Sequence, residues 1–120
     1  METKFKFNSQ ICTTREQSER LLALGLKKET ADMALHFSYV DCEGNAYYIA
    51  YPIGHQCTAI PAWSLHRLIE MCNIVIRVLR HRVSLSSGKG FSTEETLYDN
   101  LIDCIEWLIK EGYFNKEYLV

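Results

Sequence analysis

The chain has 120 residues, of which 48% are hydrophobic and 23% charged, and its formal net charge is −2. This length and composition predict one globular domain, residues 1–120, and exclude a disordered chain or one that needs a disulfide or metal to fold. Five cysteines stand at wide intervals without a C-x-x-C motif, which indicates reduced thiols. No apolar run is long enough for a signal peptide or a membrane span, so we expect a cytoplasmic protein.

A helix is the first predicted element. Thr13, followed three residues later by Glu16, forms a capping box, and Gly25 is suited to end the helix. The apolar face of this helix consists of Leu21, Leu22 and Leu24. Polar residues around Thr30 then predict one more helical turn.

A β-hairpin is predicted next. Residues 34–40 (ALHFSYV) and 46–51 (AYYIAY) are rich in aromatic and β-branched side chains, and residues 41–45 (DCEGN) have the composition and length of a hairpin turn. Two strands alone form a marginal sheet, so we expect either a third strand or a homodimer.

A second helix is predicted from Pro61, a residue suited to a first helical turn. Apolar residues then recur at steps of three and four, which favours a helix as far as residue 83. They are Leu65, Leu68, Ile69, Cys72, Ile76, Leu79 and Val83. The β-branched run at residues 74–76 favours a strand instead. Residues 73–83 therefore stay open between helix and strand, with the helix fitting the spacing better.

A third helix follows a second capping box, Ser92-Thr93-Glu94-Glu95, and Gly112 ends it. Its core stripe comprises Leu97, Leu101, Ile105, Leu108 and Ile109. Its acidic stripe comprises Glu95, Asp99, Asp103 and Glu106. The tail, residues 113–120, is apolar enough to dock on its own domain or on a partner. Together these elements predict an α+β fold: an N-terminal helix, a β-hairpin and two longer C-terminal helices packed on a small antiparallel sheet.

Three stretches carry a resemblance to known proteins: TREQSERLLALGLKKETADM, PAWSLHRLIEM and LYDNLIDCIEWLIKEGYFNKEYL. They resemble a group of small uncharacterised proteins that prophages and other mobile elements of gut anaerobic bacteria encode. In that group a proline ends the PAWSL helix soon after its LIEM-like residues and strands follow, which implies an α+β fold. Here Cys72 and Asn73 follow Met71 without a proline. The resemblance implies no activity and no catalytic residue.

Metal and cofactor sites are not predicted. His55 and Cys57, with His36 and Cys42 on the hairpin, are suitable zinc ligands, but no pair has the close spacing of zinc motifs. Residues 87–89 (SGK) lack the glycine and the hydroxyl residue that a phosphate-binding loop requires. We therefore expect no metal and no cofactor.

Catalytic residues are not predicted either. Ser64 and His66 would lie on different faces of a helix, and Cys104 lies on an acidic helix that would raise a thiol pKa. Asp99 and Asp103 lie one turn apart, as paired catalytic or metal-binding carboxylates do, but an acidic solvent-facing stripe is far commoner. We therefore expect that the protein is not an enzyme.

Basic side chains gather in residues 73–83 (NIVIRVLRHRV). Residues 61–90 have a net charge of +4 and residues 91–120 a net charge of −5. Arg77, Arg80 and Arg82 could bind nucleic-acid phosphates, but a slightly acidic chain has the wrong overall charge for that role. We favour an internal contact, in which an antiparallel helix pair brings Arg77 and Arg80 level with Asp99 and Asp103.

The hypothesis that the sequence favours is therefore a protein-interaction role as an accessory protein of a mobile element. The candidate partner-binding residues are Tyr47, Tyr48, Tyr51, Tyr113 and Phe114. A nucleic-acid-associated regulator that uses Arg77, Arg80 and Arg82 is the first alternative. A small enzyme is the second, and it would require a pocket with perturbed titratable groups.

Overall fold

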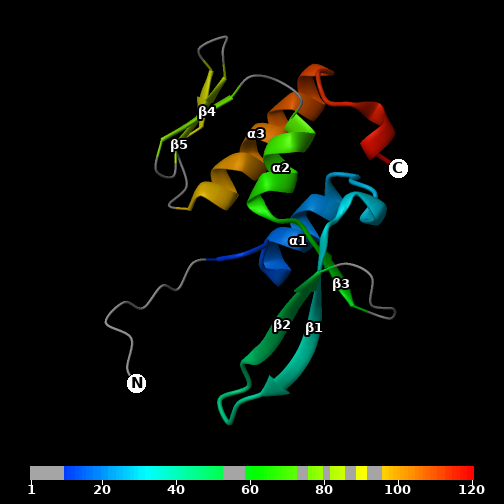
Figure 1. Cartoon of the computed structure of the whole chain (residues 1–120), viewed down its shortest axis with the longest axis vertical. Coiled ribbons are helices and arrows are strands. Elements are labelled where there is room, and N and C mark those ends of the chain that lie inside the picture. Colours follow the sequence, from blue (N-terminus) through cyan, green and yellow to red (C-terminus); the bar gives the residue numbers. More distant parts are fainter. Residues whose placement is uncertain (1–9, 53–58, 73–75, 80–81, 86–88, 92–95) are drawn as a thin grey trace.

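The computed structural model describes residues 10–52, 59–72, 76–79, 82–85, 89–91 and 96–120. The helices are α1 (Arg15–Ala23), α2 (Leu65–Cys72) and α3 (Leu97–Glu111), with the 3₁₀ turns η1 (Lys28–Thr30) and η2 (Lys116–Tyr118). The strands are β1 (Met33–Val40), β2 (Ala46–Pro52), β3 (Ile60–Ala62), β4 (Ile76–Leu79), β5 (Arg82–Leu85) and β6 (Gly90–Phe91). Helices and antiparallel strands are combined, which confirms the α+β fold (Figure 1).

Helix α1 begins one residue later than predicted. Its N-cap is Thr14, whose side chain accepts from the backbone N–H of Gln17, while the Gln17 side chain accepts from the Thr14 backbone N–H. Thr13 does not cap the helix, because its buried hydroxyl accepts a hydrogen bond from the backbone N–H of Trp63 at 3.0 Å. Gly25 ends the helix with a φ of 101°, as predicted.

The predicted hairpin is confirmed, and β3 supplies the expected third strand. The sheet order is β2-β1-β3, and β3 pairs only with residues 33–35 at the base of β1. Pro61 therefore lies in an edge strand and does not open a helix. Proline has no backbone N–H, and it is tolerated there because an N–H on the outer side of an edge strand would have no strand to bond with. Helix α2 starts four residues later, where Asp32 accepts from both the N–H and the hydroxyl of Ser64.

The prediction of a continuous helix to residue 83 is wrong, since α2 ends at Cys72. Strands β4 and β5 follow and pair as an antiparallel hairpin, with Arg77 opposite Ser84 and Leu79 opposite Arg82. The β-branched residues of this stretch prefer extended backbone, which opposes the three-and-four spacing and agrees with the strands. Strand β6 completes a second three-stranded sheet of order β4-β5-β6.

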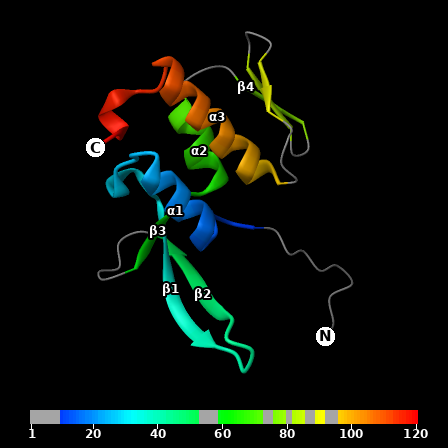
Figure 2. The ribbon, with the colours of Figure 1, turned by 180° about the vertical axis from the view of Figure 1, so that it is seen from behind.

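Helix α3 lies at the centre of the main core. Its N-cap is Thr96, and the capping box predicted at residues 92–95 lies outside the described residues. Gly112 ends the helix with a φ of 78°, as predicted. The fully buried apolar residues of α3 are Leu101, Ile102, Cys104, Ile105 and Leu108. They pack with Leu21 of α1, Leu68 of α2 and Val83 of β5, so both ends of the chain contribute to one core (Figure 2).

The C-terminal tail docks on its own domain. Leu119 forms an isolated β-bridge with Leu26, and the N–H of Val120 donates to the carbonyl of Gly25 at 2.8 Å. Within the tail, the Phe114 side chain is buried, and its ring makes an edge contact with the ring of Tyr118. No helix in the described part of the chain is long and apolar enough to cross a membrane.

Candidate protein-interaction surface

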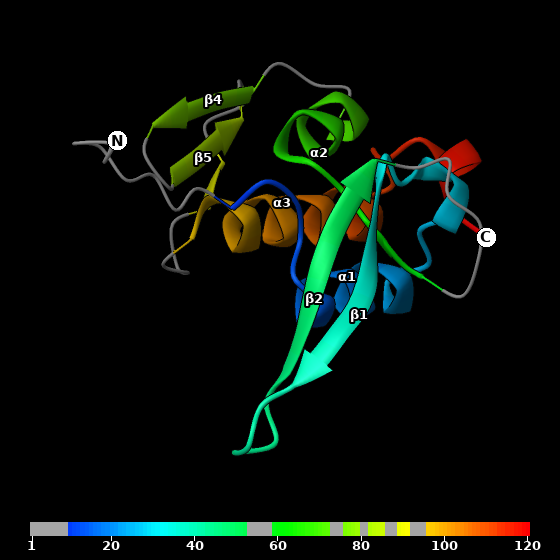
Figure 3. The same ribbon diagram turned by 60° about the horizontal axis from the view of Figure 1, so that its bottom comes forward.

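The β1–β2 hairpin extends away from the three helices (Figure 3). Its base packs in a small second cluster around Leu35, Cys12 and Ala62. Within the described residues, no third strand pairs with it beyond Leu35. We call residues 36–51 the arm.

One face of the arm exposes a row of large side chains. The register pairs Tyr39 with Tyr47 and His36 with Ile49, and Tyr51 follows on the same face of β2. The exposed fractions are 54% for Tyr39, 45% for Tyr47, 46% for Ile49 and 40% for Tyr51. We call these four side chains the outer face. Large side chains are seldom gathered in this way on a surface that binds nothing.

Ring contacts hold the outer face in a fixed arrangement. The rings of Tyr39 and Tyr47 are stacked, with centroids 4.8 Å apart and planes 13° apart. The ring of His36 meets that of Tyr51 edge-on at 5.1 Å. Cross-strand aromatic pairs of this kind stabilise a two-stranded ribbon by about 0.2–1 kcal/mol each. The exposed rings are therefore held in place before any partner arrives.

The turn at the tip of the arm is also ordered by hydrogen bonds. The carboxylate of Asp41 accepts from the backbone N–H groups of Glu43 and Asn45, both at 2.9 Å, and from the hydroxyl of Tyr47 at 3.1 Å. These bonds, led by the one from the Asn45 backbone, lower the pKa of Asp41 below its ordinary value. Gly44 has a φ of 90°, which the turn requires.

The opposite face of the arm borders a groove. This groove has a volume of about 580 Å³, and residues 10–16 form its other wall. Arm residues Ala46 and Tyr48 line it together with Leu35, and the guanidinium of Arg15 lies 5.8 Å from the centre of the Tyr48 ring. The described residues thus cover one face of β2 in part and leave the side chains of the outer face 40–54% exposed.

The chemistry of the groove does not resemble that of a catalytic site. Its one thiol is that of Cys12, whose pKa is raised by burial and then by the charge of Asp32, so the thiol stays protonated. The hydroxyl of Thr13 is bonded to that of Ser18 at 2.8 Å. No histidine lines the groove among the residues that the structure describes.

Metal ligands do not gather in the described ranges either, where no group of three or more His, Cys, Asp or Glu residues is placed to hold an ion. His36 faces the ring of Tyr51, and Cys42 is exposed at the tip of the arm. His55 and Cys57 lie outside the described residues.

The five predicted partner-binding residues do not form one surface. Tyr47 and Tyr51 lie on the outer face, but Tyr48 lies on the groove face, because neighbouring residues of a strand point to opposite sides. Tyr113 is 62% exposed, but it follows the end of α3 that lies away from the arm (Figure 1). The prediction for Phe114 is wrong, since this side chain is 4% exposed and packs in the core.

Sequence reasoning missed Tyr39 and Ile49, which complete the outer face, and also Phe37 and Val40, which are 60% and 52% exposed. A regular alternation from Ala34 would have put Tyr39 on the groove side. Ser38 has no partner in the register, however, and this bulge turns Tyr39 to the side of Tyr47. Pairing the strands from the turn inwards would have found this contact.

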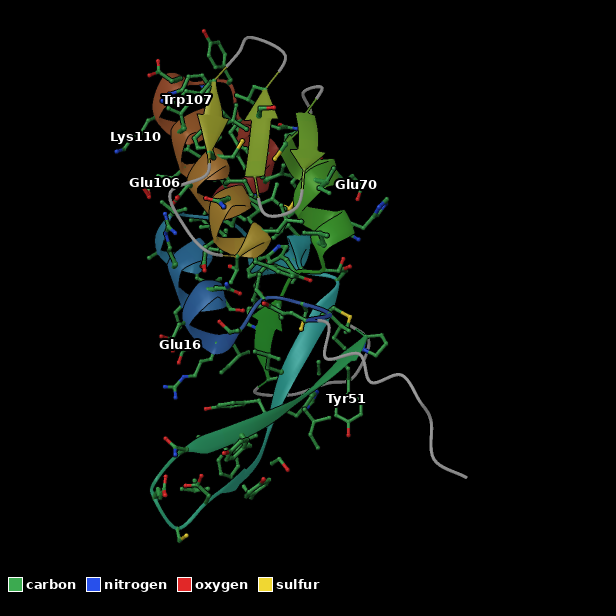
Figure 4. All side chains as sticks on the ribbon, turned by 90° about the vertical axis from the view of Figure 1, so that its left-hand side faces the viewer. Glu16, Tyr51, Glu70, Glu106, Trp107 and Lys110 are labelled. Carbon is green, nitrogen blue, oxygen red and sulfur yellow. The ribbon has the colours of Figure 1, made fainter. Side chains whose placement is uncertain are left out.

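The acidic stripe pairs with α1, and the predicted antiparallel helix pair is wrong because α2 ends at Cys72. Arg80 and the side chain of Arg77 lie outside the described part of the chain. Arg20 instead pairs with both Asp103 and Glu106, and it lies 3.3 Å from the latter. Glu106 lies near Trp107 and Lys110 on the exposed side of α3, away from Glu70 of α2 (Figure 4). Asp99 accepts from the side chain of Gln17 at 2.9 Å.

The basic stretch lies on two strands. Positions 77 and 82 fall on the sheet face opposite that of Val83 and Leu85, which are buried in the core, and Arg80 lies outside the described residues. Arg67 contacts the carbonyl of Thr30 at 3.1 Å and pairs with Glu70.

Comparison with known proteins gives no family assignment. No family model matches the chain, and no curated protein or solved structure is significantly similar to it. The role of the arm therefore has to follow from its own geometry and chemistry.

Proposed function

We propose that this protein is a non-enzymatic interaction module that binds a protein partner through the outer face of the arm. The observation that carries the proposal is the ordered row of Tyr39, Tyr47, Ile49 and Tyr51, each 40–54% exposed on a ribbon that extends from the domain. Tyrosine is enriched at protein interfaces because its large ring loses little rotamer entropy and its hydroxyl can form a hydrogen bond.

The charges of the arm indicate the surface chemistry that a partner would need. Residues 36–51 contain two carboxylates, Asp41 and Glu43, and no lysine or arginine. Both carboxylates lie at the tip, while the outer face itself is uncharged. A matching partner would offer apolar pockets for the tyrosine rings and a neutral or basic rim at the tip.

The setting that we propose is that of a cytoplasmic accessory protein of a mobile element. Its support is the resemblance of residues 13–33, 61–71 and 97–119 to such proteins. The four cysteines in the described ranges are all free, which fits a reducing compartment.

The test is affinity purification from the native host, followed by measurement of binding to each purified candidate. The variant is Tyr39→Ser/Tyr47→Ser, which removes the stacked pair. Tyr113→Ser is the matched control, because it removes an equally exposed tyrosine away from the arm. We expect the double variant to weaken binding at least about tenfold and the control to leave it unchanged. Equal binding by all three proteins would show that the outer face is not the contact surface.

A second candidate function is nucleic-acid binding through the sheet β4-β5-β6. It is supported by the register, which puts positions 77 and 82 on the face away from the core. Because binding to phosphates weakens with salt, a shift assay at about 50 mM salt is the sensitive test. We expect a shift that Arg77→Gln/Arg82→Gln abolishes if this function is real, and no shift by the wild-type protein if it is not.

A further inference from the structure

Among the residues that the structure describes, strand β2 is an open edge of its sheet. In the sheet of order β2-β1-β3 it has a strand neighbour on one side only. An open edge presents unpaired N–H and C=O groups that another strand can bind. A two-stranded ribbon is also marginally stable alone, so an added strand would stabilise the arm.

The composition of this edge does not oppose pairing. Residues 46–51 (AYYIAY) contain no charge, proline or glycine, and the proline of β2, Pro52, stands at its last position. Edge strands in soluble proteins ordinarily carry lysine, proline or a bulge that prevents pairing with another chain. In this sheet the bulge lies on the inner strand β1, at Ser38, and leaves β2 regular.

The backbone geometry shows which residues would form the bonds. The N–H of Asp41 donates to the carbonyl of Asn45 at 3.0 Å, so Asn45 points towards β1. Because successive residues of an antiparallel strand alternate, Ala46, Tyr48 and Ala50 point their N–H and C=O groups outwards. Pro52 fits this assignment, since it occupies the next outward position and has no N–H to leave unpaired.

Charge selects the occupant and its direction. The carboxylates of the arm, Asp41 and Glu43, lie at its tip. Two arms that paired in parallel would bring these tips together. Two antiparallel arms would keep them at opposite ends of the joint sheet, with only uncharged side chains between. The edge is thus self-complementary in the antiparallel direction alone.

We infer that β2 pairs antiparallel with β2 of a second copy of this chain, with Ile49 on the two-fold axis. This register pairs outward positions with outward positions: Tyr48 faces Ala50 of the second copy and exchanges two bonds with it, while Ala46 faces Pro52, which can only accept a bond because proline has no N–H. Tyr47 then lies opposite Tyr51 of the second copy, so the two outer faces form one continuous aromatic surface. The inference rests on the proposed function, because it takes the arm as the surface through which proteins bind, and it makes that surface bivalent.

Disulfide trapping tests the register. In a Cys42→Ser/Cys57→Ser background, Ile49→Cys places the new cysteines of the two copies opposite each other. Their Cα atoms would lie about 4.5 Å apart, a separation that a disulfide can span. We expect mild oxidation to give a cross-linked dimer as the major species. Phe37→Cys is the matched control, because position 37 is exposed but lies on β1. In the dimer the two β1 strands are separated by both β2 strands, so three strand spacings of about 4.8 Å each lie between the two new cysteines. We expect this control to stay monomeric.

Analytical ultracentrifugation of the wild-type chain and Ala50→Pro completes the test. Proline removes an outward N–H without removing a bond to β1, so we expect a folded monomer where the wild type dimerises. The melting temperature of the wild type should rise with protein concentration, and that of Ala50→Pro should not. A folded wild type that stays monomeric, or an Ile49→Cys protein that resists cross-linking, would overturn the inference.

The two proposals fail separately. A monomeric wild type that binds a partner through Tyr39 and Tyr47 overturns the dimer and leaves the proposed function standing. A dimer whose partner binding does not change in Tyr39→Ser/Tyr47→Ser supports the dimer and overturns the outer face as the binding surface.

Discussion

Arg20 on α1 and Asp103 on α3 form an ion pair across the contact between the first and last helices, and Glu106 accepts a second bond from the same nitrogen. The Arg20 side chain is 35% exposed and that of Asp103 20% exposed, so solvent screens the pair only in part. Hydrogen bonding to both carboxylates raises the pKa of Arg20 against the opposing effect of burial, which lowers it. The pair fixes how α1 lies on α3.

Arg20→Met should therefore lower the free energy of unfolding by about 1 kcal/mol, because it removes both charged hydrogen bonds but keeps the aliphatic contact. Urea unfolding of this variant, of Asp103→Asn and of the double variant measures the coupling. Arg15→Met is the control, since the Arg15–Glu19 pair is exposed and its loss should cost less than about 0.5 kcal/mol. Equal effects of the two arginine substitutions would show that the α1–α3 pair adds no more stability than an exposed ion pair.

Phe114→Ala should destabilise the protein by about 3–4 kcal/mol, because it leaves a cavity where a 4%-exposed ring packs in the core. Tyr113→Ala, one residue earlier, should cost less than about 1 kcal/mol because that ring is 62% exposed. Thermal unfolding of the two variants gives the comparison. A small effect of Phe114→Ala would place this ring on the surface, as the sequence suggested.

Asp32→Ala should lower the free energy of unfolding by about 2 kcal/mol, because the Ser64 N–H and hydroxyl at the start of α2 would lose their acceptor. Asp32→Asn keeps one carbonyl acceptor and should cost clearly less. Urea unfolding measures both variants. If Asp32→Asn is as unstable as Asp32→Ala, the negative charge of Asp32 contributes more stability than its hydrogen bonds to Ser64.

Asp41 should titrate below the ordinary aspartate value of about 3.9. Because its pKa is lower in the folded turn, its stabilisation of the turn is complete above about pH 3.9 and is lost as the pH falls through the lower folded value. NMR titration of the carboxyl, with hydrogen exchange of the Glu43 and Asn45 amides that donate to it, measures this. Tyr47→Phe removes one donor at 3.1 Å and should raise the pKa towards the ordinary value. An unchanged titration in this variant would exclude the phenol as a contributor.

Cys42 should be the fast-reacting thiol of a Cys57→Ser protein, since it is exposed while Cys12, Cys72 and Cys104 are buried. Hydrogen bonding to Cys72 and burial raise the pKa of Cys104, which keeps that thiol protonated. We expect the three buried thiols to react about 100-fold more slowly, through local opening. A thiol-reactive chromophore counts the fast group, and Cys42→Ser should abolish it.

Local sequence signals predicted the parts of the fold that depend on nearby residues. The turn at residues 41–45 and the aromatic strands on either side of it fix the hairpin, because turn geometry and β-propensity act over a few residues. Gly25 and Gly112 end their helices for an equally local reason, a left-handed backbone conformation. The buried stripe of α3 follows from its 3.6-residue period.

The candidate site was predicted only in part. Tyr47 and Tyr51 could be found because aromatic residues alternate along β2. Tyr39 was missed because alternation counted from Ala34 does not reveal the bulge at Ser38, whereas pairing counted from the turn places Tyr39 beside Tyr47. Phe114 looked like an exposed anchor because the sequence does not show which apolar tail residues find space in the core.

By itself, the sequence determined that this chain is an α+β protein with an aromatic hairpin and an acidic last helix. The tertiary structure alone decided that Cys72 ends α2 and that Arg20 meets Asp103, a residue 83 positions away. The reason is physical: helical spacing at 73–83 competed with β-branched preference, and packing of the sheet against α3 settled that competition. Charge pairing depends in turn on which helices pack together, and that is a property of the whole fold.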